Sequence, residues 1–280
     1  MGQIKITIDG VVCEAEKNDT ILKVARKNGI YIPTLCYLSK CEPIASCRLC
    51  VIEAENHEGL LLGCQTKVVD GLVVNTNSQR LAEERKKIMQ LYCVNHPLEC
   101  GVCDKSGECE LQNKTLEFGV TAQKFMAKEQ NREIKNWGVI QYDPSLCILC
   151  EKCVHTCNEI IGDDAIEIKV GGYKSQIGPK NSETLDCTLC GECIAVCPVG
   201  ALVSTGFKYA SNAWELKRVP SACAHCSSAC GLYYEFKHTK TEAIGEKIYR
   251  VTNDFEFSSL CNAGRFGFDY DNTASKDQKA

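Results

Sequence analysis

The sequence predicts an α+β protein built from several small domains. Alternating apolar and polar side chains in residues 3–15 predict a strand pair at the start of the chain. Residues 142–207 contain two near-identical cysteine runs, which indicate an internal repeat. The 22 cysteines fall mostly into tight groups. The length agrees with this division, since 280 residues allow one to three domains of ordinary size.

The first predicted domain covers residues 1–77. Its expected elements are a hairpin over residues 3–15, a helix from Asp19 to about Asn28, a cysteine-bearing loop over 33–50, a strand at Val51–Ala54 and a second hairpin over 68–74. Asp9-Gly10 and Asp70-Gly71 supply the hairpin turns, and Gly29 ends the helix. Together these elements indicate a small α+β domain.

An amphipathic helix is predicted for Ser78–Cys93. Its expected buried stripe consists of Leu81, Ile88, Leu91 and Tyr92, with Arg and Lys side chains on the outer face.

Residues 113–140 are polar and fit a connector. The predicted segments are a His–Cys domain at 78–120, a connector at 121–140, a repeat domain at 141–207 with a hairpin about Gly171-Gly172, a terminal domain at 214–270 and a mobile tail at 271–280.

Composition excludes several classes of function. A net charge of −4 offers no basic surface for nucleic acid. No run approaches 18 apolar residues, so no membrane span is expected, and Met1–Gly10 lacks the pattern of a signal peptide. Cys-x-x-Cys runs indicate metal sites in a reducing compartment rather than a disulfide framework. We therefore expect a cytoplasmic protein.

Nineteen cysteines and one histidine sort into five sets with the spacing of iron–sulfur ligands. The sets are Cys36/Cys47/Cys50/Cys64, His96/Cys100/Cys103/Cys109, Cys147/Cys150/Cys153/Cys157, Cys187/Cys190/Cys193/Cys197 and Cys223/Cys226/Cys230/Cys261. Three cysteines remain, of which Cys13 and Cys41 are expected to be ordinary small buried residues and Cys93 has no assigned role. The chain contains no recognisable nucleophile or acid–base constellation, so no catalytic residue is predicted.

The first set has the spacing Cys-x10-Cys-x2-Cys-x13-Cys. A [2Fe–2S] cluster needs four thiolates, two for each iron. A loop with three cysteines and a later strand with the fourth can supply them. Structural zinc is the alternative, because four cysteines also suit a tetrahedral ion.

The second set begins with a histidine, His96, just before three clustered cysteines. Histidine can replace a thiolate on iron, as it does in Rieske centres. The set therefore predicts a His-ligated cluster, with a zinc site of three cysteines and one histidine as the alternative.

The third and fourth sets repeat the spacing Cys-x2-Cys-x2-Cys-x3-Cys. In two-cluster ferredoxins the fourth cysteine of such a run ligates the other cluster. We therefore expect two [4Fe–4S] clusters with exchanged ligands. The predicted ligands are Cys147, Cys150, Cys153 and Cys197 for one, and Cys187, Cys190, Cys193 and Cys157 for the other. The fifth set is ambiguous alone, and its company favours a further [4Fe–4S] cluster over zinc.

Three segments carry a resemblance to a known family. They are SCRLCVIE at 46–53, HPLECGVCDKSGECELQ at 96–112 and LCNAGRFGFD at 260–269. Over about residues 1–270 the chain resembles the N-terminal iron–sulfur region of the respiratory complex I G subunit. The same region is shared by NAD-dependent formate dehydrogenase large subunits, [FeFe]-hydrogenase large subunits and the small diaphorase subunit of NAD-reducing [NiFe] hydrogenases.

The resemblance implies both fold and cofactors. It implies a β-grasp [2Fe–2S] ferredoxin domain, a small His–Cys [4Fe–4S] domain, a bacterial ferredoxin-like domain with two [4Fe–4S] clusters and a terminal [4Fe–4S] domain of molybdopterin-oxidoreductase type. The chain departs from the molybdenum relatives, which carry Cys-x-Lys-Gly-Arg where this sequence has Ala263. It also ends 19 residues after Cys261, so no molybdopterin domain is expected.

These features predict an electron-transfer subunit of a soluble, multi-subunit, NAD(P)-linked oxidoreductase. The resemblance implies one partner that holds FMN and binds NAD(P)H. It also implies a catalytic partner, for which a [NiFe] hydrogenase is the favoured candidate. Free ferredoxin, with electron bifurcation, is a further candidate partner. The alternatives are the same role in a formate dehydrogenase or a complex-I-like NADH dehydrogenase and, from another class, a zinc-stabilised interaction scaffold.

Overall fold

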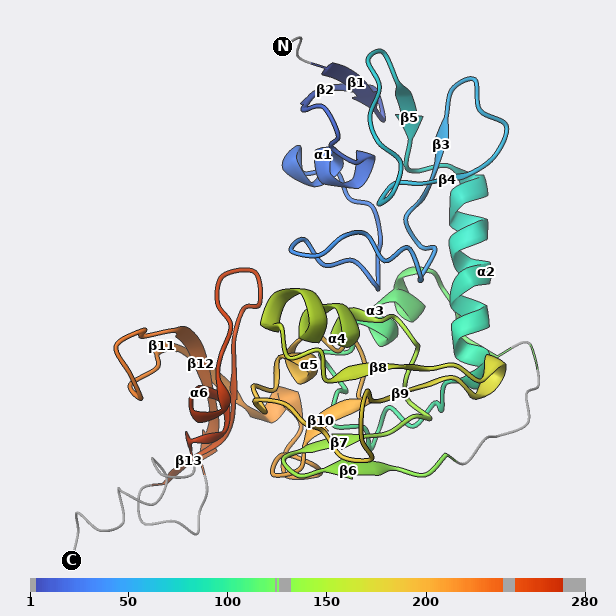
Figure 1. Ribbon diagram of the computed structural model, residues 1–280. Coiled ribbons are helices and arrows are strands. Elements are labelled where there is room, and N and C mark those ends of the chain that lie inside the picture. Colours follow the sequence, from blue (N-terminus) through green and yellow to red (C-terminus); the bar gives the residue numbers. More distant parts are fainter. Residues whose placement is uncertain (1–3, 124, 126–131, 239–244, 269–280) are drawn as a thin grey trace, which may run out of the picture. The chain divides into compact units, whose positions relative to one another are not determined.

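The computed structural model describes residues 4–123, 125, 132–238 and 245–268 (Figure 1). The chain divides into two compact units, residues 1–95 with 113–129 and residues 96–112 with 130–280. Helices and strands are both present in short elements, as the predicted α+β class requires. Among the described helices none is long and apolar enough to cross a bilayer.

The first unit contains a five-stranded sheet in the order β2-β1-β5-β3-β4. Its elements are β1 (Ile4–Ile8), β2 (Val11–Ala15), α1 (Ile21–Lys27), β3 (Val51–Ala54), β4 (Leu61–Leu62), β5 (Val73–Asn75) and α2 (Gln79–Asn95). Strands β1 and β2 are antiparallel, β1 and β5 are parallel, and β3 is antiparallel to both β4 and β5. Helix α3 (Glu110–Glu117) begins in the second unit and ends in the first.

The predicted first hairpin and helix are confirmed, with one correction. Asp9 and Gly10 turn the chain in left-handed conformations, with φ angles of 51° and 83°. The helix is capped by Thr20, whose side chain accepts the Lys23 N–H, and not by Asp19. Asp19 is occupied elsewhere, because its carboxylate accepts the Glu16 N–H and pairs with the lysines of α1.

The predicted hairpin over residues 68–74 is wrong, although its turn at Gly71 exists with φ of 77°. The segment before the turn forms no strand with β5. Instead the Val68 N–H donates to the Asp19 carbonyl. The segment after the turn bonds to β1, where the Thr7 N–H donates to the Leu72 carbonyl. Long-range pairing therefore replaces the local one.

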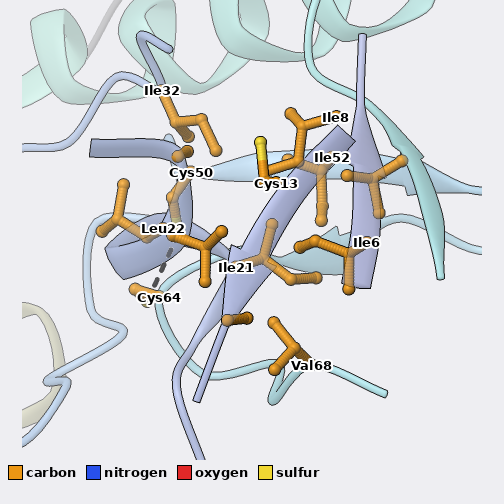
Figure 2. Close-up of a cluster of buried hydrophobic side chains, with 14 of the residues drawn as sticks. Ile6, Ile8, Cys13, Ile21, Leu22, Ile32, Cys50, Ile52, Cys64 and Val68 are labelled. Atoms are coloured by element: carbon orange, nitrogen blue, oxygen red, sulfur yellow. Dashed lines mark hydrogen bonds between the residues drawn. The ribbon is translucent and has the colours of Figure 1, made fainter. Parts of the chain in front are cut away.

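Apolar side chains from β1, β2, β3 and α1 fill one core, shown in Figure 2. Ile8, Ile21, Leu22 and Ile52 are fully buried there. Cys50 and Cys64 belong to the same buried cluster and point toward each other. The core therefore supports two of the predicted ligands directly.

Helix α2 follows the prediction in position but not in its buried face. Its N-terminus is capped by Ser78, whose hydroxyl accepts the Leu81 N–H. The buried residues are Leu81, Arg85, Met89 and Cys93, spaced every four positions. Leu91, expected in the stripe, is 64 % exposed. The predicted outer face is also wrong at Arg85, which is buried.

The second unit contains three small antiparallel sheets and several short helices. The sheet orders are β10-β7-β6, β11-β12-β13 and β8-β9. The elements are β6 (Lys135–Trp137), β7 (Ile140–Tyr142), α4 (Lys152–His155), a π-helical turn (Thr156–Ile161), β8 (Ile166–Lys169), a 3₁₀ turn (Gly172–Lys174), β9 (Gln176–Pro179), α5 (Glu192–Ala195), β10 (Leu202–Ser204), a second 3₁₀ turn (Ala213–Glu215), β11 (Lys217–Ala222), β12 (Gly231–His238), β13 (Glu246–Thr252) and α6 (Asn262–Phe266).

The hairpin predicted about Gly171-Gly172 is confirmed as β8 and β9. The polar stretch over 113–140 is not only a connector, because α3 extends to Glu117 and β6 pairs with β7. Within this stretch, β6 buries Trp137, whose ring stacks on that of Tyr142. The predicted tail, 271–280, lies outside the described residues.

Candidate iron–sulfur cluster sites

The first ligand set forms two close pairs of thiols. Cys50 precedes β3 and Cys64 follows β4, and their Sγ atoms are 3.3 Å apart (Figure 2). Cys36 and Cys47, both in the loop before β3, interact in the same way through their thiols. All four are buried. Two pairs of sulfurs are the arrangement that a cluster with two thiolates on each of two irons requires.

Backbone N–H groups point at these sulfurs. The Leu35 N–H lies 3.4 Å from Cys47 Sγ, and the Cys47 N–H lies 3.4 Å from Cys36 Sγ. The hydrogen bond with the Cys36 thiol, aided by backbone N–H donors and opposed by burial, lowers the pKa of Cys47 to about 6. The thiolate is the form that binds metal. The same interaction, together with burial, raises the pKa of Cys36, so this pair favours one thiolate at Cys47.

Arg85, which sequence reasoning missed, holds the backbone on both sides of Cys50. Its guanidinium donates to the carbonyls of Leu49 at 3.2 Å and Val51 at 2.8 Å, and to that of Thr76 at 3.0 Å. A buried charge on a helix was unexpected, because Arg usually lies on the outer face. The four-residue spacing that Arg85 shares with Leu81 and Met89 is the signal that could have identified it.

The second set lines a single small cavity. His96, Cys100, Cys103 and Cys109 all border it, together with Leu146 and Gly200. His96 Nδ1 is buried and has no hydrogen-bond partner among the described residues. Burial lowers the pKa of His96, opposed by a backbone hydrogen bond at Leu146 and the charge of Asp143. A neutral imidazole with an orphaned nitrogen beside three thiols fits a metal ligand.

The cavity of the second set is closed by a glycine. A Cβ atom on Gly200 would lie 2.6 Å from Cys103 Sγ, closer than such atoms approach. The Gln112 N–H lies 3.5 Å from Cys109 Sγ. Both contacts place backbone directly against the predicted ligands.

The third set gathers with one cysteine of the fourth, as the exchanged pattern predicts. Cys147, Cys150, Cys153 and Cys197 line one cavity, and Tyr142 borders it. Burial and then the charge of Cys197 raise the pKa of the Cys150 thiol. Cys157 does not border this cavity.

Cys157 lies instead with the second run. Burial is the main cause of the raised pKa of Cys193, followed by the charges of Cys190, Cys157 and Cys187, with Arg265 opposing. The Cys157 thiol likewise has Cys187 among the charges that raise its pKa, after burial. The cavity lining thus groups Cys197 with the first run, and the electrostatic interactions group Cys157 with the second run.

The two runs share one backbone conformation, which follows from their shared spacing. Leu149 and Glu151 in the first run have φ of 52° and 64°. Leu189 and Gly191, at the same places in the second run, have φ of 54° and 72°. Such left-handed residues turn successive N–H groups toward one concavity, which suits an anionic group. The Leu189 N–H accordingly lies 3.4 Å from Cys187 Sγ.

The fifth set is less completely assembled than the others. Cys223 is buried in a small apolar cluster, against which Cys230 packs. Cys261 caps α6, and a Cβ atom on Gly264 of that helix would lie 3.4 Å from Cys223 Sγ. Cys226 and Cys261 are exposed.

The cysteines outside the sets are small partners in packing. Cys13 is buried in the core of the first unit, as expected, and Cys93 is buried on α2. Cys41 is only half-buried, contrary to expectation, because its loop lies at the surface. All 22 cysteines lie within the described residues, and none forms a disulfide.

Three family models match successive parts of the chain. A 2Fe-2S iron-sulfur cluster binding domain matches residues 2–79. The NADH-ubiquinone oxidoreductase-G iron-sulfur binding region matches residues 85–124. The ferredoxin-like domain of NADH-quinone oxidoreductase subunit 3 matches residues 138–203.

Several curated proteins are similar over nearly the whole chain. The alpha subunit of an NADPH-Fe(3+) oxidoreductase from Geobacter sulfurreducens is 40 % identical over 98 % of this chain and 32 % of its own length. The G 2 subunit of an NADH-quinone oxidoreductase from Rhizobium meliloti is 36 % identical over 95 % of this chain and 31 % of its own length. The chain spans about a third of the length of the curated relatives it matches.

A solved structure is also similar. A chain of the NAD+-reducing [NiFe]-hydrogenase in the H2-reduced state matches with a TM-score of 0.69 and 29 % identity. The match covers 74 % of this chain and 90 % of that chain.

Sites and matches together define an iron–sulfur protein with both [2Fe–2S] and [4Fe–4S] domains. The chain carries the N-terminal iron–sulfur region shared by complex I G subunits and related oxidoreductase subunits, including a hydrogenase chain. The resemblance noted in the sequence is thereby confirmed.

Proposed function

We propose that the chain is an electron-transfer subunit of an NAD(P)-linked oxidoreductase complex and holds five iron–sulfur clusters. The observation that carries the proposal is the grouping of the predicted ligands. The first set contains a close thiol pair, one cavity is lined by His96, Cys100, Cys103 and Cys109, and another is lined by Cys147, Cys150, Cys153 and Cys197. Iron–sulfur clusters supply one-electron redox chemistry at potentials that their surroundings set. The chain's own role is to hold, bury and orient them.

The proposed ligand sets are those that the sequence predicts. Cys36, Cys47, Cys50 and Cys64 hold a [2Fe–2S] cluster, and four sets hold [4Fe–4S] clusters: His96/Cys100/Cys103/Cys109, Cys147/Cys150/Cys153/Cys197, Cys187/Cys190/Cys193/Cys157 and Cys223/Cys226/Cys230/Cys261. The orphaned Nδ1 of His96 supports its inclusion. The packing of Gly264 on Cys223, in the helix that Cys261 caps, supports the last set.

A zinc-stabilised scaffold is not favoured. Within the described residues, no group of three or more His, Cys, Asp or Glu side chains has the spacing for a single metal ion. The sulfurs of the second and third sets surround cavities instead. Ligands spread around a cavity suit a larger group, such as a cluster of four irons, better than one tetrahedral ion.

The proposed partners are a subunit that binds FMN and NAD(P)H and a catalytic subunit, for which we favour a [NiFe] hydrogenase. Similarity to a chain of an NAD+-reducing [NiFe]-hydrogenase supports this choice. An NADPH-linked oxidoreductase is the second candidate, because an alpha subunit with that name is 40 % identical. A formate dehydrogenase is an outcome that the experiment below distinguishes, and NADH-dependent quinone reduction by the same complex would identify a complex-I-like role.

Metal analysis tests the cluster proposal. Anaerobically purified chain should contain about 18 iron atoms, since one [2Fe–2S] and four [4Fe–4S] clusters are proposed. Reduction with dithionite should give EPR signals of both cluster types. Iron near zero with zinc present, or a blank EPR spectrum, would refute the proposal.

Purification of the native complex tests the partners. We expect co-purification of a flavoprotein and hydrogen-dependent reduction of NAD. NADPH-dependent reduction without hydrogen uptake would favour the second candidate, and formate-dependent reduction would identify a formate dehydrogenase. Hydrogen-driven NAD reduction at full rate without added ferredoxin would exclude electron bifurcation.

A further inference from the structure

The two cysteine runs carry opposite charges at the same position. Lys152 stands between Cys150 and Cys153 in the first run, and Glu192 stands at the matching place between the second and third cysteines of the other. Each begins a four-residue helix, α4 or α5. Both are buried, at 6 % and 0 % exposure. Two buried charges next to predicted ligands require partners.

Lys152 forms an ion pair with Glu110 of the His–Cys segment, residues 96–112. Its Nζ lies 3.1 Å from the carboxylate of Glu110, the residue directly after Cys109. The Glu110 N–H donates to the Pro198 carbonyl at 2.9 Å. Pro198 in turn follows Cys197, the cysteine of the fourth set that lines a cavity with Cys147, Cys150 and Cys153. Side chain and backbone thus fix the second set beside the third.

Glu192 forms an ion pair with Arg265 of the terminal segment, residues 245–268. Its carboxylate accepts hydrogen bonds from the Arg265 guanidinium at 2.7 Å, the Leu260 N–H at 2.6 Å and the Asn253 side chain at 3.2 Å. Leu260 and Arg265 lie on either side of Cys261 in the sequence. Arg265 Nε also donates to the Cys190 carbonyl at 2.9 Å. One buried carboxylate therefore joins the fourth set to the fifth.

A glycine makes room for this second connection. A Cβ atom on Gly191 would overlap with Arg265 Cδ and lie 2.8 Å from Phe266 Cζ. The first run carries Glu151 at the same position in a similar backbone conformation. The backbone angle alone therefore does not require glycine here. Close approach of Arg265 does.

We propose that Lys152 and Glu192 are positioning residues that seat the His–Cys segment and the terminal segment on the two runs. The proposal rests on the proposed function, because the segments matter as holders of neighbouring clusters. Each ion pair places one charge of either sign beside a run. Removal of a positive charge near a cluster lowers its reduction potential, and removal of a negative charge raises it. The two members of each pair must therefore act in opposite directions.

EPR-monitored redox titration of the full chain, with its clusters assembled anaerobically, tests this expectation. We call the cluster proposed on Cys147, Cys150, Cys153 and Cys197 the third-set centre, and the cluster proposed on Cys187, Cys190, Cys193 and Cys157 the fourth-set centre. Lys152→Gln should lower the midpoint potential of the third-set centre. Glu110→Gln should raise that potential by a smaller amount, because Glu110 is half exposed. Arg265→Gln should lower the potential of the fourth-set centre, and Glu192→Gln should raise it. Each centre is assigned by the signal that is lost in Cys147→Ala or Cys187→Ala.

The matched control is Glu167→Gln, which removes an exposed ion pair with Lys169 in the same unit. It should leave both potentials unchanged. Shifts of one sign for both members of a pair, or a control shift of similar size, would overturn the proposal. A generally loosened fold would not give opposite signs.

A second measurement serves if Arg265→Gln does not fold. Arg265→Lys keeps the charge but cannot make the two guanidinium hydrogen bonds, one to the Glu192 carboxylate and one to the Cys190 carbonyl, at the same time. We expect an unchanged midpoint potential and a smaller magnetic splitting between the fourth-set and fifth-set centres. Gly191→Ala, which keeps every charge, should reduce the same splitting. An undiminished splitting in both variants would overturn the positioning role.

The proposed function and the positioning role can be refuted separately. A chain that holds no iron in its unchanged form refutes the proposed function. Another outcome is a chain with its full iron content, whose midpoint potentials and magnetic splittings do not change when the charges of these two ion pairs are removed. That result refutes only the positioning role of Lys152 and Glu192.

Discussion

The first sheet region, residues 4–75, and the terminal region, residues 217–268, hold their cysteines in different ways. Among the described residues, the first has sixteen buried members in its core cluster, and its four predicted ligands are all buried. The terminal cluster has four buried members, and two of its predicted ligands are exposed. Strand β11 is exposed along its whole length.

This contrast indicates two ways to build a metal site. Where an apolar core is large, we expect the chain to fix the predicted ligands before metal binds. Where the core is small, the bound group supplies much of the folding free energy, as structural metals do in small domains. We expect the terminal region to depend on its cluster far more than the first region does.

Removal of iron should have the largest effect and should fall on one region. In the cluster-free chain, amides of β12 and β13 should lose most of their protection from hydrogen exchange, because four buried side chains cannot hold the sheet. Amides of β1 and β3 should keep theirs. Peptide-level exchange by mass spectrometry measures both at once. Equal loss in the two regions would end the distinction.

Truncation of the larger core should show how much it contributes. Ile52→Ala removes a fully buried side chain from the first region and should cost about 2–5 kcal/mol, from lost burial and the cavity left behind. Exchange of β1 amides in the cluster-free chain reports this cost. Val12→Ala, at an exposed position of the same sheet, is the control and should change little. A cost below about 1 kcal/mol for Ile52→Ala would contradict a preformed core.

Loss of Arg85 should destabilise the backbone around Cys50 in the first site. Arg85→Gln removes most of three hydrogen bonds to carbonyls around Cys50, at about 1.5–3 kcal/mol for bonds from a charged donor. Denaturant unfolding followed at the visible absorbance of the [2Fe–2S] cluster measures it. Arg80→Gln breaks an exposed pair with Glu53 and should cost at most about 1 kcal/mol. Equal costs would show that burial of Arg85 is irrelevant.

The smallest effect should come from the cap of α1. Thr20→Ala removes the acceptor of the Lys23 N–H and should cost about 1 kcal/mol, while Thr20→Ser should cost less. Exchange of amides in the first turn of α1 reports the difference. No difference between the variants would mean that core contacts alone set the helix start.

Local patterns allowed much of this fold to be predicted from the sequence. The hairpins at Asp9-Gly10 and Gly171-Gly172 and the strand Val51–Ala54 all follow from neighbouring residues. The pairing of β5 with β1 could not be predicted in this way, because its partners lie more than 60 residues apart. Its spacing with Leu81 and Met89 places Arg85 on the buried face of α2, but the carbonyls of Leu49 and Val51 that accept its hydrogen bonds could be identified only in the folded chain.

The site was predicted from spacing, and spacing has clear limits. Regular runs placed Cys197 with Cys147, Cys150 and Cys153, where the structure brings them together. The charges that join the segments, such as Arg265 to Glu192, have no recurring spacing and could be found only in the folded chain. The ligand sets and the domain boundaries themselves stay predictions.

Leu149 and Leu189 adopt backbone angles that cost a bulky residue roughly 1–3 kcal/mol each. The rest of the fold, or a bound cluster, has to offset this strain. Without iron we therefore expect both loops to relax first, which would expose their thiols to oxidation.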